Sequence, residues 1–222
     1  PADYKRIKVV SSLSELFNKQ FGGSGEVNCI VLPRPLSEDF NALVQWLGKT
    51  EYITTFKSEF RKPVPNFSEA QLHFLKKDMP TAAAAAAAVI LQDMEAASKK
   101  YMHSILRFVR PGKSYDSVFA LHHDEVQSTN SMMGRFMCCY NGPVTEGARN
   151  EDVLPTRDEE TGQQTGEYML LHNAQVFSFR PGDLWRQLST PYLKNIAPPY
   201  IHRSPWLNPG DSPRLLLIAS RP

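Results

Sequence analysis

The residues in this chain whose types and spacing suit metal chemistry are the run His122-His123-Asp124 and the later His202. Two imidazoles and one carboxylate bind one face of a divalent iron and leave the opposite face open for a substrate and dioxygen. If the run lies on a strand, residues two apart share a face, so His122 and Asp124 point inward and His123 points away. We therefore predict a metal site made by His122, Asp124 and His202. The alternative is that these are ordinary core or surface histidines and that Asp124 starts a turn.

A suitably placed arginine would extend this site to an organic anion. Arg214 follows His202 at the start of an apolar run, and a buried guanidinium needs an anion. The far carboxylate of 2-oxoglutarate is a fitting bidentate partner, so the interpretation is Fe(II) with 2-oxoglutarate as cosubstrate. Arg135 is a second candidate for the carboxylate, and Tyr140 is a candidate for lining the same pocket. Alternatively, Arg214 pairs with an acid such as Asp211.

Other polar and aromatic residues are weaker candidates for this pocket. His172 ends an expected strand and competes as a ligand. Thr145 and Glu146 are expected near the mouth of the barrel, where Glu146 is either a replacement ligand or an ordinary solvent-facing acid. Trp185 and Trp206 either wall the pocket or pack in the core, and core packing is the simpler interpretation.

The elements that position these residues change character along the chain. Apolar positions repeat with helical spacing at about residues 12–19, 37–48, 68–77 and 82–102, with Ser37 and Ser68 as expected N-caps and Gly48 as an expected end. One strand is expected at residues 27–32. From residue 104 the spacing changes to two, with short apolar runs between Gly, Pro and Asn turns. These predicted strands cover residues 105–109, 117–121, 134–140, 168–171, 175–179, 184–188 and 214–219.

This pattern predicts an α+β fold in a single domain over residues 1–222. Residues 104–222 are expected to form a jelly roll, a double-stranded β-helix of cupin-like form, because many short strands favour a sandwich or small barrel. Residues 1–103 are expected to be mainly helical and to pack on it. Residues 141–167 are rich in Gly, Thr and charge and are predicted to be a long loop, functional or disordered.

Composition limits the partners of the protein. A net charge of +2 over 222 residues, with scattered basic residues, argues against a nucleic-acid partner. No run of 18 apolar residues exists, so no membrane span is expected. Three cysteines, with Cys138 and Cys139 adjacent, make a poor disulfide framework and favour a reducing compartment such as the cytoplasm. On a strand these two thiols point to opposite faces as small buried hydrophobes. The chain begins at Pro1, which is compatible with removal of a targeting segment.

The order of the motifs resembles that of a known domain family. The family is mostly bacterial, is uncharacterised and carries a "domain of unknown function" label. Its pattern is His-x-Asp, an apolar strand running into Tyr-x-Gly-Pro-x-Thr-Glu, and a late His-Arg-Ser-Pro before Arg-Leu-Leu; the matching pieces here begin at His122, Tyr140, His202 and Arg214. Val144 stands where the family has a second glycine, which affects the expected loop geometry but not the ligand pattern. The barrel is also similar to Fe(II)/2-oxoglutarate oxygenases, a likeness at the level of fold alone.

Three functional classes follow from these patterns. The first is a mononuclear non-haem Fe(II), 2-oxoglutarate-dependent oxygenase that acts on a small molecule or a side chain. The second is a cupin-like metal-binding protein of zinc homeostasis without redox activity, which the resemblance implies because some family members are linked to zinc-responsive genes. The third is an interaction module in which the histidines are incidental. The sequence indicates neither the substrate nor the oligomeric state.

Overall fold

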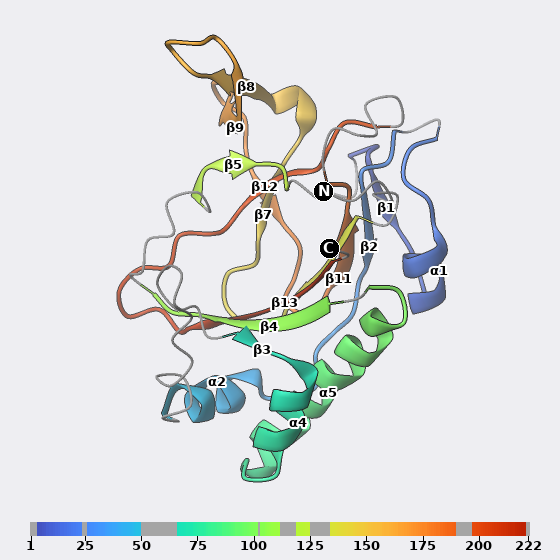
Figure 1. The fold of residues 1–222 in the computed structure, drawn as a ribbon, viewed down its shortest axis with the longest axis vertical. Helices are drawn as coiled ribbons and strands as arrows, with labels where there is room; N and C mark the ends of the chain where they lie inside the picture. The colour runs from blue at the N-terminus through green and yellow to red at the C-terminus, as the bar shows by residue number, and fades with distance from the viewer. Residues whose placement is uncertain are drawn as a thin grey trace.

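The computed structural model of the chain describes residues 4–23, 26–49, 66–101, 103–111, 119–124, 134–189 and 197–220. Its mixed α+β class is the one predicted. Two curled sheets face each other, and helices cover the outer side of the larger sheet (Figure 1). Within the described residues, no helix is long and apolar enough to cross a membrane.

The larger sheet has seven strands in the order β1-β2-β11-β6-β13-β4-β3. Its strands are β1 (Ile7–Val9), β2 (Cys29–Leu32), β3 (Asn66–Phe67), β4 (His103–Val109), β6 (Arg135–Cys139), β11 (Leu184–Gln187) and β13 (Arg214–Ser220). Only the pair β1 and β2 is parallel among these. The first part of the chain therefore contributes strands to this sheet as well as helices. The predicted strand at residues 27–32 is present as β2, whereas β1 and β3 are too short to give a sequence pattern.

The smaller sheet has six strands in the order β10-β7-β12-β5-β9-β8. Its strands are β5 (Leu121–His122), β7 (Glu146–Ala148), β8 (Val153–Arg157), β9 (Gln164–Leu170), β10 (Phe177–Ser178) and β12 (Ile201–Arg203). A 3-10 turn, η2 (Asn150–Asp152), leads into β8. The hairpin of β8 and β9 projects beyond the rest of the sheet (Figure 1).

Four helices accompany the sheets in the described part of the chain: α1 (Leu13–Asn18), α2 (Phe40–Lys49), α4 (Glu69–Lys76) and α5 (Thr81–Ser98). The helices α2, α4 and α5 cover the outer face of the larger sheet, and α5 packs across β4 and β13 (Figure 1). The alanine run of α5 explains this close packing, because Ala83, Ala86 and Ala87 are fully buried and small enough to bring the helix near the sheet.

The strand β6 shows how the larger sheet separates two apolar clusters. Phe136 and Cys138 face the helices, and Met137 and Cys139 face the smaller sheet. Successive side chains of a strand point to opposite faces, which is the arrangement predicted for the two adjacent cysteines. Both thiols are free and buried, as expected for small apolar residues. The cavity beside His122, Asp124 and His202 lies on the same face of the sheet as Met137.

A buried polar network ties α5 to the larger sheet on its helical side. The guanidinium of Arg34 forms two 2.7 Å hydrogen bonds to the carboxylate of Asp93, and the hydroxyl of Tyr140 donates to the same carboxylate at 2.7 Å. Asp93 is almost wholly buried, so its charge depends on these donors.

Replacing Asp93 with alanine is expected to destabilise the fold by about 3 kcal/mol, because it leaves the Arg34 cation and the Tyr140 hydroxyl without their acceptor. The midpoint of urea unfolding measures this loss. The matched control is Glu95→Ala on the same helix, which breaks an exposed ion pair with Lys99 and should leave the midpoint unchanged. Equal midpoints for the two variants would contradict the prediction.

Most helix predictions are confirmed, with differences at the ends. Ser12 and Ser68 accept hydrogen bonds from the backbone of the first turns of α1 and α4, and Ser68 forms a full capping box. At α2 the cap is Asp39 rather than Ser37, because its carboxylate accepts from the backbone of Asn41 and Ala42. This helix includes Gly48 instead of ending there, and α5 ends at residue 98, short of the predicted 102.

The prediction of a long loop at residues 141–167 is wrong. This stretch contains β7, η2, β8 and the start of β9. The strands β8 and β9 form a hairpin whose residues are mostly exposed, so they need no alternation of apolar and polar residues. The predicted strand at residues 168–171 is present as the end of β9, where Tyr168 and Leu170 pack on an apolar cluster, but the exposed remainder of the hairpin gave no hydrophobic spacing.

Candidate metal centre

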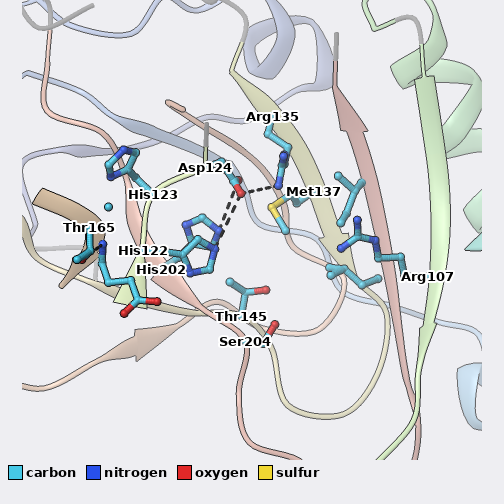
Figure 2. Close-up of a pocket in the computed structure, with 14 residues that line it drawn as sticks. Arg107, His122, His123, Asp124, Arg135, Met137, Thr145, Thr165, His202 and Ser204 are labelled. Atoms are coloured by element: carbon cyan, nitrogen blue, oxygen red, sulfur yellow. Dashed lines mark hydrogen bonds and ion pairs between the residues drawn. The ribbon is translucent and has the colours of Figure 1, made fainter. Parts of the chain in front are cut away.

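The strands β5 and β12 place the two predicted histidine ligands side by side. They pair in antiparallel fashion with His122 directly opposite His202, and the two rings lie 4.6 Å apart. Asp124 follows β5 and turns toward them: its carboxylate is 3.5 Å from His202 Nε2 and 4.0 Å from His122 Nε2 (Figure 2). One ligand atom from each of the three residues lies within 4.8 Å of the others. The structure thus brings together the three residues predicted as ligands.

Hydrogen bonds to the backbone determine which ring nitrogen of each histidine faces the centre. His122 Nδ1 lies 2.8 Å from the carbonyl of Ala120, and His202 Nδ1 lies 3.4 Å from the carbonyl of Tyr200. A carbonyl oxygen only accepts, so each Nδ1 carries the hydrogen and each Nε2 keeps its lone pair. Both lone pairs are therefore on the nitrogens that approach Asp124.

The charges of this group suit a divalent cation. Burial lowers the pKa of His202 to about 4, so its imidazole is neutral at neutral pH. Burial alone would raise the pKa of Asp124, but His202, Arg135 and His122 together with the Gln187 hydrogen bond hold it below its ordinary value. Two imidazoles and one carboxylate are the donor set of a mononuclear iron or zinc site.

The separations also fit a single ion. Ligand atoms about 2.1 Å from a metal and at right angles are about 3 Å apart. His202 Nε2 lies 3.5 Å from Oδ2 of Asp124, and His122 Nε2 lies 4.0 Å from Oδ1 of the same carboxylate, so both distances exceed this value by about 0.5 to 1 Å. The three side chains must move closer to hold one ion, and their donor types fit the metal that the sequence predicts.

The burial of His202 gives an expected pH dependence in the metal-free protein. Its pKa falls from 6.5 to about 4 on folding, so below pH 6.5 the unfolded chain takes up a proton that the folded protein does not. Stability should decrease as the pH falls, by about 2 kcal/mol between pH 7 and pH 5 from this group. Urea unfolding of the metal-free protein at both values measures it. His202→Gln should remove this part of the slope, and an unchanged slope would contradict the assignment.

Two donors from the larger sheet hold the carboxylate of Asp124. Arg135 Nη1 is 2.5 Å from Oδ1, and Gln187 Nε2 donates to Oδ2 at 2.7 Å. Arg135 was predicted as a candidate for the cosubstrate carboxylate; its guanidinium instead contacts the carboxylate of a metal-ligand candidate (Figure 2). Sequence reasoning missed Gln187, although the apolar alternation of residues 184–188 leaves it as a buried polar residue.

A cavity of about 320 Å³ opens beside the three ligand candidates. Both sheets line it, with Met137, Leu216 and Ile218 as its apolar wall and Thr145 and Ser204 as hydroxyl groups. This volume is within the range of small-ligand pockets.

Arg214 is not among the described residues that line this cavity, but it contacts Ser204, which does. It is 1% exposed and alternates with Leu216 and Ile218, which places it on the inner face of β13. Its Nη2 donates to Ser204 Oγ at 3.3 Å, but its Nε and Nη1 have no hydrogen-bond partner among the described residues. The alternative pairing with Asp211 is not found, because Asp211 instead accepts from the backbone of Asn208. Burial lowers the pKa of Arg214, as expected for a cation that lacks an anion.

Arg107 lines the cavity together with Arg135, and sequence reasoning missed it. It lies on β4 opposite Leu216, and its side chain lines the wall across from the ligand candidates (Figure 2). The alternation of β4 was visible in the sequence, but the pairing with β13 that brings Arg107 to this cavity was not. Arg214 lies on β13 two residues before Leu216, the residue that pairs with Arg107. The two arginines are therefore diagonal neighbours on one face of the sheet.

Several other predicted residues lie elsewhere. Tyr140 is on the opposite face of the larger sheet, where its hydroxyl contacts Asp93, so it does not line this cavity as predicted. Glu146 pairs with Arg203 at 2.6 Å instead of approaching the ligands. His172 is exposed and is not among the residues that line the cavity.

The two tryptophans differ from each other. Trp185 is fully buried, as predicted, and its indole nitrogen donates to Gln187. Trp206 is 63% exposed and contacts Phe119 with the two rings tilted and their centroids 4.9 Å apart, so the prediction of core packing is wrong for it.

Comparison with known proteins finds no family model that matches the chain and no matching curated protein. The resemblance to the uncharacterised domain family therefore stays a prediction.

Proposed function

We propose that this protein is a mononuclear non-haem Fe(II), 2-oxoglutarate-dependent oxygenase. His122, Asp124 and His202 would hold the metal. The observation that carries the proposal is their convergence at a cavity with a buried, incompletely paired arginine behind its wall. When bound, Fe(II) with 2-oxoglutarate and dioxygen supplies oxidation of an unactivated C–H bond, chemistry that side chains alone lack.

The strand order supports a jelly-roll core for this proposal. Apart from the β8–β9 hairpin, the chain from β4 to β13 places four strands in each sheet. The neighbours are β11-β6-β13-β4 in one sheet and β10-β7-β12-β5 in the other. This is the order that two interlocked Greek keys produce. It puts the second and the seventh strands of the core, β5 and β12, next to each other, which is why a His-x-Asp and a distant histidine meet.

The chain's own residues would bind and orient the cosubstrate. Arg214 has two nitrogens without partners, Nε and Nη1, and Ser204 offers a hydroxyl beside it in the cavity wall. A carboxylate at this position would satisfy a buried cation that now lacks an anion. Ser204 directly follows β12 and is two residues from His202, so about 7 Å separates them if the chain stays extended, which suits a short dicarboxylate that reaches from the metal to the arginine.

The remaining walls indicate a modest substrate. Met137, Leu216 and Ile218 offer an apolar surface, and Thr145 offers a hydroxyl. A small molecule or a single side chain fits a cavity of about 320 Å³ better than an extended polymer does.

The proposal is tested by the metal content of the purified protein and by succinate formation. Metal-free protein is reloaded with Fe(II) under anaerobic conditions and then given 2-oxoglutarate and air. We expect one iron per chain and slow succinate formation even without substrate. Tight binding of zinc with no succinate from the iron-loaded protein would favour the zinc-homeostasis alternative. No metal binding at all would overturn both.

A further inference from the structure

Gln187 occupies a central position in this site that its neutral side chain does not by itself explain. It is 1% exposed, and its amide nitrogen donates to Asp124 Oδ2 at 2.7 Å while lying 3.2 Å from His202 Nε2. One amide group therefore contacts two of the three ligand candidates.

Trp185 determines which end of this amide faces the ligands. Its indole Nε1 lies 3.0 Å from Gln187 Oε1, and the two residues project from the same face of β11. An indole N–H only donates, so the amide oxygen must be at the tryptophan and the NH2 group at Asp124 and His202. Turning the amide over would leave a buried indole N–H without an acceptor, which is unfavourable.

One amide hydrogen has a well-placed acceptor, Oδ2 of Asp124 at 2.7 Å. The amide nitrogen lies at similar distances from both ring nitrogens of His202, 3.2 Å from Nε2 and 3.5 Å from Nδ1. It therefore packs against the imidazole and does not lie along the Nε2 lone pair, which remains available to a metal ion. In the metal-free protein these contacts hold both groups in place.

Arg135 does not make Gln187 redundant. Arg135 contacts Oδ1 of Asp124, whereas Gln187 contacts Oδ2. A carboxylate held at one oxygen can still rotate about its terminal torsion, which is broad for aspartate. Held at both oxygens, it has one orientation.

We propose that Gln187, oriented by Trp185, is a positioning residue that holds Asp124 and His202 ready to bind a metal. This inference rests on the metal site of the proposed function but not on oxygenase chemistry. Groups that orient metal ligands in this way typically contribute 10–100-fold to affinity.

The test is titration of the metal-free protein with Co(II), followed by the visible absorption of the bound ion. Gln187→Met keeps the size of the side chain and removes its donor. We expect its dissociation constant for Co(II) to rise about 10–100-fold and its absorption bands to shift as the carboxylate loses its orientation. Trp185→Phe, which keeps Gln187 but frees its amide, should shift both readouts in the same direction by less.

Tyr140→Phe is the matched control, because it removes a buried hydrogen bond on the opposite face of the same sheet. It should lower the midpoint of thermal unfolding without changing Co(II) affinity or absorption. If Gln187→Met lowers only the thermal midpoint, Gln187 is structural and the inference is overturned. If Gln187→Met does not fold, Trp185→Phe decides by the same two readouts. His122→Ala separates the metal site from the role of Gln187. If His122→Ala binds Co(II) as the unmodified protein does, the metal site itself is wrong; if only Gln187→Met binds normally, the role of Gln187 is wrong.

Discussion

His122→Ala is expected to abolish metal binding while leaving the fold intact. The imidazole of His122 supplies one of three ligand atoms, and its hydrogen bond within the described residues goes to the backbone carbonyl of Ala120. Loss of a direct ligand should cost more than the roughly 10–100-fold that loss of an outer partner costs. Metal analysis after dialysis against Fe(II) or Zn(II) measures the effect, and 2-oxoglutarate-dependent succinate formation should disappear with the metal.

His123→Ala is the natural control for this variant. The two histidines are adjacent, but His123 Nδ1 lies 3.0 Å from the hydroxyl of Tyr168, away from the ligand cluster (Figure 2). His123→Ala should keep its metal. Equal metal content in the two variants would refute the ligand assignment. Asp124→Asn is less clean as a test, because it also disturbs the contacts with Arg135 and Gln187.

Arg214→Met is expected to weaken 2-oxoglutarate binding on the order of 100-fold, or ~3 kcal/mol, because a buried charge pair would lose its cation. The same variant should leave metal content unchanged. It should not destabilise the ligand-free protein and can stabilise it, since it removes a buried cation whose Nε and Nη1 lack partners. Calorimetric titration of the metal-loaded protein with 2-oxoglutarate and thermal unfolding of the ligand-free protein measure the two effects.

Arg107→Met tests the competing anchor. Arg107 lines the same cavity from β4, so a carboxylate could contact it instead. If Arg214 is the anchor, Arg107→Met should change the affinity for 2-oxoglutarate far less than Arg214→Met does. The reverse order would move the anchor to β4 without affecting the metal site. Loss of affinity in neither variant would argue against 2-oxoglutarate as the cosubstrate.

The helices and the core strands were predictable from local pattern because local contacts largely form them. Ser68 followed by Gln71 gives a capping box. The apolar run around Met137 gives a strand that is buried on both faces. Elements with little apolar burial escaped prediction. The hairpin of β8 and β9 is mostly exposed and only its end near Tyr168 shows the hydrophobic pattern that predicted a strand, and β5, β7 and β12 are two or three residues long.

In the site, direct ligands were easier to find than the groups that hold them. A His-x-Asp followed by a distant histidine is a distinctive combination of metal-binding side chains, so His122, Asp124 and His202 could be predicted together. Gln187 and Arg107 are ordinary residue types, and although the strand pattern around each was visible in the sequence, the strand pairings that bring them to the site were not. Conversely, Tyr140 has a suitable residue type but the wrong strand parity, since it faces the helices with Cys138.

The sequence by itself determined which donors the protein has and which strand face each could occupy, since residue type sets ligand chemistry and the two-residue period sets direction. Only the tertiary structure decided which donors meet. The pairing of β5 with β12 brings together histidines 80 residues apart, and the pairing of β11 with β6 places Gln187 opposite Arg135 at one carboxylate. Such non-local contacts depend on how the two sheets assemble, and no local pattern encodes them.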